Sequence, residues 1–193
     1  MNIKKIAVFC GSNSGFNPEF TELAQDLGRL LVRNGIDLVY GGGQVGMMGS
    51  IAKEVIKHGG KVYGVIPRFM REKELAYEAC TELIVTEDMH ERKAKMVQLA
   101  DGFIALPGGI GTLEELIEVF TWLQLKIHRK PVALLNHNGY YNYLLKLLTH
   151  MVDSGLMKDS HMSKLIHAYS SEKLLEKILQ TKYVEDESWY VTN

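Results

Sequence analysis

The sequence has little of what marks secreted, membrane-spanning or metal-centred proteins. Its two cysteines, Cys10 and Cys80, stand alone, without the spacing of a disulfide framework or a cysteine–histidine metal site. No apolar run is long enough to span a bilayer, and the first residues lack the apolar stretch and cleavage site of a signal peptide. We therefore expect a cytoplasmic protein with reduced, packed thiols and no bound metal.

An excess of charge of one sign is also missing. Lysine and arginine number 22 and aspartate and glutamate 23, so the formal net charge is −1. This balance gives no basic surface for nucleic acid or membrane. The 193 residues, 46% of them hydrophobic, suffice for one sizeable core. We expect a single domain over residues 1–181, a C-terminal tail over residues 182–193, and a small molecule as partner.

Apolar runs alternate with amphipathic stretches along the chain. Short, nearly wholly apolar runs, typical of strands buried on both faces, predict strands at Ile3–Cys10, Ile36–Tyr40, Val62–Ile66, Leu83–Val85, Phe103–Leu106 and Pro131–Leu135. Helices are predicted over residues 18–34, 47–58, 89–100, 113–127, 140–154, 160–166 and 171–181. This alternation is typical of βαβ units. We therefore expect an α/β fold, a Rossmann-like doubly wound parallel sheet with helices on both faces.

Glycine-rich turns follow three of the predicted strands. They begin at Gly11, Gly41 and Gly108, and each leads into a predicted helix. Because the carboxyl ends of parallel strands meet at one edge of a sheet, the three turns should lie together where such folds bind ligands. Glycine lets the backbone approach a ligand closely, and a helix N-terminus attracts anions. The three turns together predict a phosphate-binding site.

The third of these turns carries the richest pattern, Pro107-Gly108-Gly109-Ile110-Gly111-Thr112-Leu113-Glu114-Glu115. We expect Thr112 to cap the following helix and the two glutamates to lie in its first turn. Acidic residues are common at helix starts because they interact favourably with the helix dipole. Helix capping is therefore one interpretation of Glu114 and Glu115, and a role beside the bound ligand is the other.

Other nucleotide motifs fit less well. Gly41, Gly43 and Gly46 match the dinucleotide fingerprint G-x-G-x-x-G. The match follows the second strand rather than the first. The third strand runs into Pro67 and Arg68, with no acid to hold a ribose diol, which argues against NAD. A P-loop and a nucleophile elbow are both absent. What remains is a mononucleotide-sized anion site near carboxylates and the cationic pair Arg92-Lys93.

Three segments together resemble the Lonely Guy family of cytokinin riboside 5′-monophosphate phosphoribohydrolases, long mislabelled as lysine decarboxylases. They are residues 41–49 (GGGQVGMMG), 89–94 (MHERKA) and 107–115 (PGGIGTLEE), within a resemblance that covers about residues 3–179. The resemblance implies release of a free adenine-type base and ribose 5-phosphate from a nucleoside 5′-monophosphate. It implies no cofactor, and family members are commonly homodimers. The chain shows no pyridoxal-phosphate lysine motif.

The resemblance also implies roles for individual residues. Arg92 and Glu115 would form the catalytic pair, with Glu115 holding the ribose hydroxyls, orienting water, or both. The residues expected along the nucleotide are Glu74, Lys93, Gly109, Ile110, Gly111, Thr112, Glu114 and Thr121. The glycine turns add Gly11, Ser12, Gly41, Gly42 and Gly108 as substrate contacts.

Two alternatives stay open at this point. A nucleotide-binding or carrier protein without turnover would share the fold, and an NAD-dependent oxidoreductase is a weaker third possibility. The predicted helix over residues 113–127 is apolar on two faces, which indicates either an unusually buried helix or a dimer interface.

Overall fold

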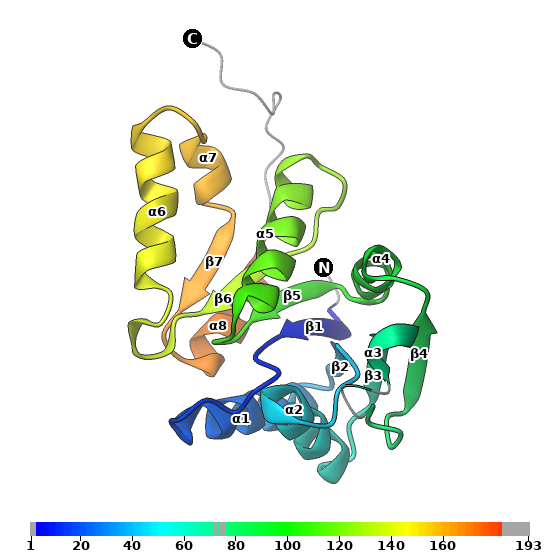
Figure 1. Ribbon diagram of the computed structural model, residues 1–193. Helices are drawn as coiled ribbons and strands as arrows, with labels where there is room; N and C mark the ends of the chain where they lie inside the picture. The colour runs from blue at the N-terminus through cyan, green and yellow to red at the C-terminus, as the bar shows by residue number, and fades with distance from the viewer. Residues whose placement is uncertain (1–2, 72, 74–75, 183–193) are drawn as a thin grey trace.

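The computed structural model describes residues 3–71, 73 and 76–182. The strands are β1 (Lys5–Phe9), β2 (Asp37–Tyr40), β3 (Val62–Pro67), β4 (Glu82–Thr86), β5 (Gly102–Ala105), β6 (Val132–Leu135) and β7 (Leu165–Ala168). The helices are α1 (Glu19–Arg33), α2 (Gly46–Lys57), α3 (Arg68–Arg71), α4 (Met89–Leu99), α5 (Ile110–Gln124), the 3-10 turn η1 (His137–Gly139), α6 (Asn142–Asp153), α7 (Asp159–Met162) and α8 (Ser171–Gln180). Figure 1 shows their arrangement.

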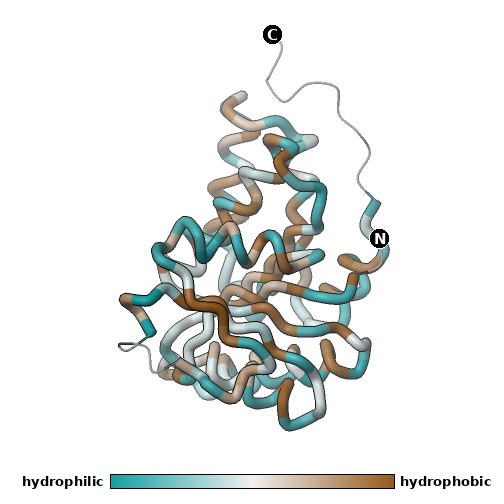
Figure 2. The backbone as a smooth tube through the Cα atoms, turned by 90° about the vertical axis from the view of Figure 1, so that its right-hand side faces the viewer, coloured by the Kyte–Doolittle hydropathy of each residue, from teal (hydrophilic) through white to brown (hydrophobic). Residues whose placement is uncertain are grey.

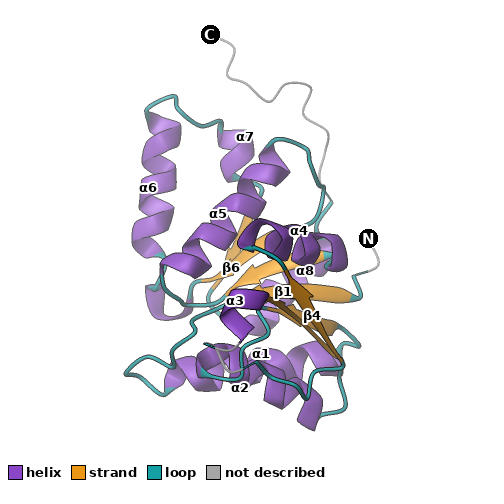
Figure 3. Ribbon diagram, turned by 45° about the vertical axis from the view of Figure 1, so that its right-hand side comes forward, coloured by secondary structure: helices purple, strands orange, loops and turns teal. Residues whose placement is uncertain are grey.

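The strands form one parallel sheet in the order β4-β3-β2-β1-β5-β6-β7. The chain builds outward from β1 to β4 and then returns to β5, on the other side of β1. Helices α1, α2 and α8 cover one face, and α4, α5 and α6 cover the other (Figures 1 and 3). The turns after β1 and β5 therefore lead to opposite faces, and ligands of such sheets bind in the crevice between them.

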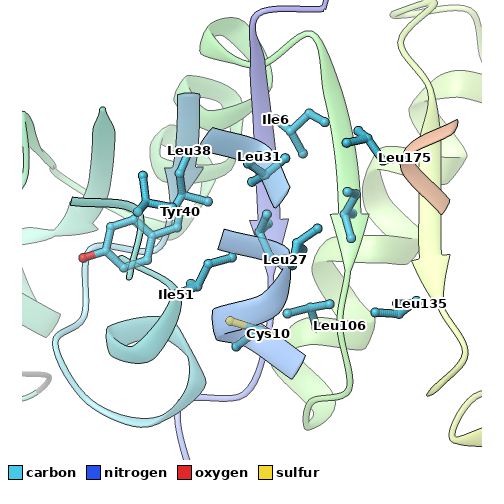
Figure 4. Packing of buried hydrophobic residues seen from close by; sticks show 14 of the residues in the cluster. Ile6, Cys10, Leu27, Leu31, Leu38, Tyr40, Ile51, Leu106, Leu135 and Leu175 are labelled. Carbon is cyan, nitrogen blue, oxygen red and sulfur yellow. The ribbon is translucent and has the colours of Figure 1, made fainter. Parts of the chain in front are cut away.

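Each face of the sheet carries its own hydrophobic core. On one face, Leu27 and Leu31 of α1 and Ile51 of α2 pack on Ile6 and Leu38 of the sheet, all fully buried (Figure 4). The leucines are four residues apart, which places them on one stripe of the helix. Each fully buried side chain of this kind contributes about 1.5–3 kcal/mol. Figure 2 shows hydrophobic segments along the strands in the middle of the molecule. The strands are thereby held firmly under the crevice.

The fold class expected from the sequence is confirmed, and the six predicted strands agree with β1–β6 by at most two residues at either end. The helix predicted over residues 160–166 is wrong in its second half, because α7 ends at Met162 and β7 begins at Leu165. β7 pairs with β6 at the sheet edge. A four-residue apolar run does not by itself distinguish a strand from a helix.

The segment after the third strand contains α3, but Glu74, a predicted substrate contact, lies outside the described residues. So do residues 183–193, which make up all but the first residue of the predicted tail. The proposed boundary at residue 181 stays a prediction. Within the described ranges, no helix combines the length and the apolar character needed to cross a bilayer.

Candidate functional site

A crevice lies at the carboxyl ends of the strands, where the chain changes direction between β1 and β5. Its main part is a cavity of about 330 Å³ lined by Cys10, Ser12, Met48, Met70, Met89, Arg92, Gly109, Ile110, Gly111, Thr112, Glu114 and Glu115. A second cavity of about 240 Å³ shares Ser12 and Gly109 with it and extends past Gly11 and Gly108 to Phe20 and Tyr140. The crevice is thus where the fold predicts a ligand.

The glycine loop after β5 faces this crevice. A Cβ atom built on Gly109 or Gly111 would meet no described heavy atom within 4 Å. Gly109 precedes the first residue of α5, Ile110, and a helix leaves its first N–H groups without intrahelical partners. Together with the positive end of the helix dipole, these N–H groups make the loop suited to an anion.

The start of α5 corrects two predictions. The helix begins at Ile110 rather than Leu113, so Thr112 lies buried within its first turn and is not the cap. Gly109 takes the capping position with an extended backbone. Glu114 and Glu115 are consequently the fifth and sixth residues of α5, beyond the first turn. The interpretation of these glutamates as simple helix-start acids is therefore wrong, and both line the crevice.

Arg92 lies on α4 and is 5% exposed. Its Nε donates to the carbonyl of Val65 at 3.1 Å, and its Nη2 donates to the carbonyl of Gly41 at 3.4 Å. Nη2 also lies 3.8 Å from Oε1 of Glu115, whose side chain is 11% exposed. A buried charge needs a partner and hydrogen bonds. The carbonyls of Val65 and Gly41 and the carboxylate of Glu115 supply them, so the guanidinium is fixed beside that carboxylate.

The glycines of the β2–α2 loop support this arrangement from behind. A Cβ on Gly41 would lie 2.1 Å from Nη2 of Arg92, and one on Gly46 (φ +61°) would lie 2.1 Å from the carbonyl oxygen of Ser12. Gly42 (φ +80°) accepts a hydrogen bond from the N–H of Tyr77. Among the described residues, the predicted substrate contacts Gly41 and Gly42 do not line either cavity. Protein atoms occupy the space that a dinucleotide fingerprint would leave for a ligand.

Lys93 is likewise placed behind the crevice wall rather than in it. Its side chain is 8% exposed and pairs with Glu114 and, at 3.1 Å, with Oε1 of Glu118. Burial lowers the pKa of Lys93, but its two carboxylate partners outweigh burial and raise that pKa above its usual value. Lys93 therefore stays charged and holds the carboxylate of Glu114 at the crevice.

Cys10 lines the larger of the two cavities together with Glu115. Burial and the nearby charge of Glu115 raise the pKa of the Cys10 thiol. Cys10 therefore stays a neutral thiol at the floor of the site. Within the described part of the chain, the side chains offer no group of three or more His, Cys, Asp or Glu that could hold a metal ion.

One predicted residue lies away from the others. Thr121 is exposed further along α5 and does not line either cavity of the described crevice. Sequence reasoning missed Cys10, Met48, Met70, Met89 and Tyr140. Four of them follow the carboxyl end of a strand within six residues, and Met48 lies in the first turn of α2. Their position in the topology was the available signal, because nothing in their residue types marks a site.

A parallel sheet with a crevice at its switch point, an anion-binding glycine loop and a buried arginine–glutamate pair define a Rossmann-like ligand-binding protein. The sequence model of the family described as "possible lysine decarboxylase" matches residues 48–178. Cytokinin riboside 5′-monophosphate phosphoribohydrolase LOG5 of Arabidopsis thaliana is 48% identical over 95% of this chain and 80% of its own length. The corresponding probable enzyme LOGL3 of Oryza sativa is 46% identical over 91% and 83%. The chain belongs to the family that this sequence model describes and that contains the two phosphoribohydrolases. This confirms the resemblance to the Lonely Guy family seen in the sequence.

Solved structures share the fold. A molybdenum cofactor binding protein from Rippkaea orientalis superposes with a TM-score of 0.68 at 25% identity, covering 93% of this chain and 97% of its own. The molybdenum cofactor carrier protein of Chlamydomonas reinhardtii gives 0.68 at 23% identity, over 93% and 100%. The second likeness shows the fold alone.

Proposed function

We propose that this protein hydrolyses the N-glycosidic bond of adenosine 5′-monophosphate or an N6-modified derivative, releasing the free base and ribose 5-phosphate. The observation that carries the proposal is the buried Arg92–Glu115 pair in the wall of a crevice that also holds an open, anion-binding glycine loop. The 48% identity to a phosphoribohydrolase supports it. The reaction needs no metal or organic cofactor.

The loop at the start of α5 anchors the 5′-phosphate in this proposal. N–H groups in the stretch Gly109–Thr112 supply donors, and Ser12 lines the same cavity. The phosphate takes no part in the bond that breaks. Its binding energy instead holds C1′ of the ribose near Glu115, which removes much of the entropic cost of reaction.

The chemistry falls to Glu115 and Arg92. Breaking the bond between C1′ and the base develops positive charge on the ribose, as in an oxocarbenium ion, and a carboxylate beside the ring stabilises that charge. Glu115 also accepts from the ribose hydroxyls or from the attacking water, whose oxygen forms the new bond to C1′. Arg92, held by two backbone carbonyls, fixes the carboxylate in place.

A carrier without turnover is the second candidate, because a molybdenum cofactor binding protein shares the fold at 25% identity. Binding alone needs anion donors but gives no reason for a buried arginine–glutamate pair beside them. The hydrolase therefore explains more of the site than the carrier does.

The test is release of adenine from AMP, followed by chromatography, for the wild type, Glu115→Gln and the control Glu172→Gln on the exposed face of α8. We expect release by the wild type and the control, and a loss of kcat on the order of 100-fold in Glu115→Gln with AMP binding kept. Tight binding without release from AMP or an N6-prenylated analogue would favour the carrier. Equal release by all three proteins would remove Glu115 from the mechanism.

We also propose that the protein is a cytoplasmic homodimer. Cys10 and Cys80 are both free thiols. Apolar side chains are exposed just after α5 and along α6, where Ile127 is 63% and Tyr143 is 83% exposed, and such patches mark interfaces. Sedimentation should give twice the mass of the chain, whereas a monomer at micromolar concentration would contradict this assembly.

A further inference from the structure

The glycine loop is held from behind by its carbonyl groups. Three successive carbonyls each accept a hydrogen bond: Leu106 from the hydroxyl of Tyr141 at 2.6 Å, Pro107 from the N–H of Gly11 at 3.3 Å, and Gly108 from the hydroxyl of Tyr140 at 2.7 Å. The next carbonyl, that of Gly109, accepts from the N–H of Leu113 within α5. Protein donors thus occupy these four carbonyls. Among the described residues, no backbone carbonyl accepts from the N–H of Gly108 or Gly109, so these two groups can face a ligand.

The two tyrosines are themselves fixed by the turn after β6. Asn136 is fully buried, and its side chain accepts from the N–H of Tyr141 at 2.7 Å and donates to Asn142 at 2.8 Å. The ring of Tyr140 packs edge-on against Tyr141 and Phe20, with centroids 5.0 and 5.8 Å away. Tyr141 is 5% exposed and Tyr140 is 44% exposed, so the ring contacts with Tyr141 and Phe20 are what hold the hydroxyl of Tyr140 at the loop.

The bond to Gly108 has a directional consequence. The carbonyl of Gly108 and the N–H of Gly109 belong to one peptide unit, which is planar and trans, so they point in opposite directions. Holding the carbonyl toward Tyr140 turns the N–H away from Tyr140. A free glycine pair would sample many orientations of that unit, because glycine has the widest backbone freedom.

We propose that Tyr140 is a positioning residue for the substrate phosphate: its hydroxyl locks the Gly108–Gly109 peptide so that the Gly109 N–H donates to the phosphate. Tyr141 fixes the base of the same loop through Leu106. Neither residue touches the reacting bond. This inference rests on the proposed function for the identity of the anion, and the geometry of the loop carries the rest.

The test compares Tyr140→Phe with Tyr169→Phe, a control of the same chemistry whose side chain is 65% exposed just after β7. We expect KM for AMP to rise about threefold to tenfold in Tyr140→Phe, the effect of losing one hydrogen bond, while kcat changes less than twofold. Tyr169→Phe should match the wild type in both. An unchanged KM in Tyr140→Phe, or a fall in kcat at constant KM, would overturn the proposal.

Binding measurements separate this proposal from the proposed function. The dissociation constants of inorganic phosphate and of AMP, by calorimetry, should rise by the same factor in Tyr140→Phe, because both ligands present the anion to the loop. If the wild type releases no base, the proposed hydrolysis fails, and these constants still decide the role of Tyr140. A lower melting temperature with unchanged constants would show a merely structural role and overturn the inference.

Discussion

Two glycine loops lie at the same edge of the sheet and serve opposite purposes. Around the β2–α2 turn, Cβ atoms on Gly41 in the loop and on Gly46 and Gly49 in the first turn of α2 would lie 2.1, 2.1 and 2.0 Å from protein atoms. At the β5–α5 turn, a Cβ atom on Gly108 would lie 2.1 Å from Oγ1 of Thr112, but Cβ atoms on Gly109 and on Gly111, the second residue of α5, would meet no described atom within 4 Å. The glycines around the first turn thus make room for the protein, whereas Gly109 and Gly111 of the second leave room for a ligand.

The difference shows that a glycine pattern alone does not identify a ligand site. The G-x-G-x-x-G match sits in the β2–α2 loop, where Arg92 and the backbone of Ser12 fill the space. The β5–α5 loop lacks that match but faces the crevice. What distinguishes them is the neighbour of each glycine, which follows from the packing of distant segments.

The largest effect, on catalysis, is expected at Gly41, where the β2–α2 loop contacts Arg92 of the proposed catalytic pair. In Gly41→Ala the new Cβ would displace the guanidinium of Arg92, and we expect kcat/KM to fall on the order of 100-fold. Steady-state kinetics with AMP measures this. The double variant with Arg92→Lys should be no worse than Arg92→Lys alone, because both changes act through one guanidinium. Additive losses would show that Gly41 acts by another route.

The next largest effect is on stability. Gly46 has φ +61° and its Cβ would strike the carbonyl of Ser12, so Gly46→Ala should lower the free energy of unfolding by about 1–3 kcal/mol. Gly111→Ala is the matched control, since a methyl group there meets open space in a helix that favours alanine. Urea denaturation measures both. Equal destabilisation by the two changes would erase the contrast between the loops.

A smaller effect, on substrate binding, is expected at Gly109 of the β5–α5 loop, which faces the crevice. Gly109→Ala places a methyl group in the crevice without backbone strain, because its φ is −83°. We expect KM for AMP to rise by about tenfold, or about 1.4 kcal/mol, at an unchanged melting temperature. A fall in melting temperature with normal KM would mean that this loop, too, is packed by protein.

The smallest effect concerns the pH dependence of stability and arises at His128, away from both glycine loops. It distinguishes a loss of stability in acid from a change at the candidate site. Buried His128 joins its Nε2 to the carbonyl of Val119 at 2.9 Å, while its Nδ1 accepts from the N–H of Lys130 at 3.1 Å. Burial and the charge of Lys130 lower the pKa of His128 in the folded state. Its stabilising contribution is therefore complete above the ordinary value of about 6.5 and falls as the pH drops below it.

Urea unfolding at pH 7.5 and 5.5 checks this expectation. The wild type should lose about 1 kcal/mol between the two values. His128→Asn should be less stable at pH 7.5 but should lose less on acidification, because asparagine does not titrate. An identical loss in both proteins would place the acid sensitivity elsewhere, for example at His167, whose pKa burial also lowers.

The sequence was sufficient to predict six strands, the parallel sheet and the segment that carries Glu115, because apolar runs and glycine turns record local structure. It was insufficient for β7, whose four residues gain strand geometry from pairing with β6. The roles of Lys93 and Tyr140 were also out of reach. The role of Lys93 depends on its ion pairs with Glu114 and Glu118 of α5. The role of Tyr140 depends on a hydrogen bond to the carbonyl of Gly108, 32 residues earlier in the chain. Such contacts follow from the topology of the whole chain.

The most direct test of the contrast between the loops is a titration of the labelled wild-type protein with inorganic phosphate, followed by amide NMR. We predict large, saturable shifts for the N–H groups of Gly109, Ile110 and Gly111 and only small shifts for those of Gly43 and Gly46. Shifts concentrated in the β2–α2 loop, with the start of α5 unmoved, would contradict the account.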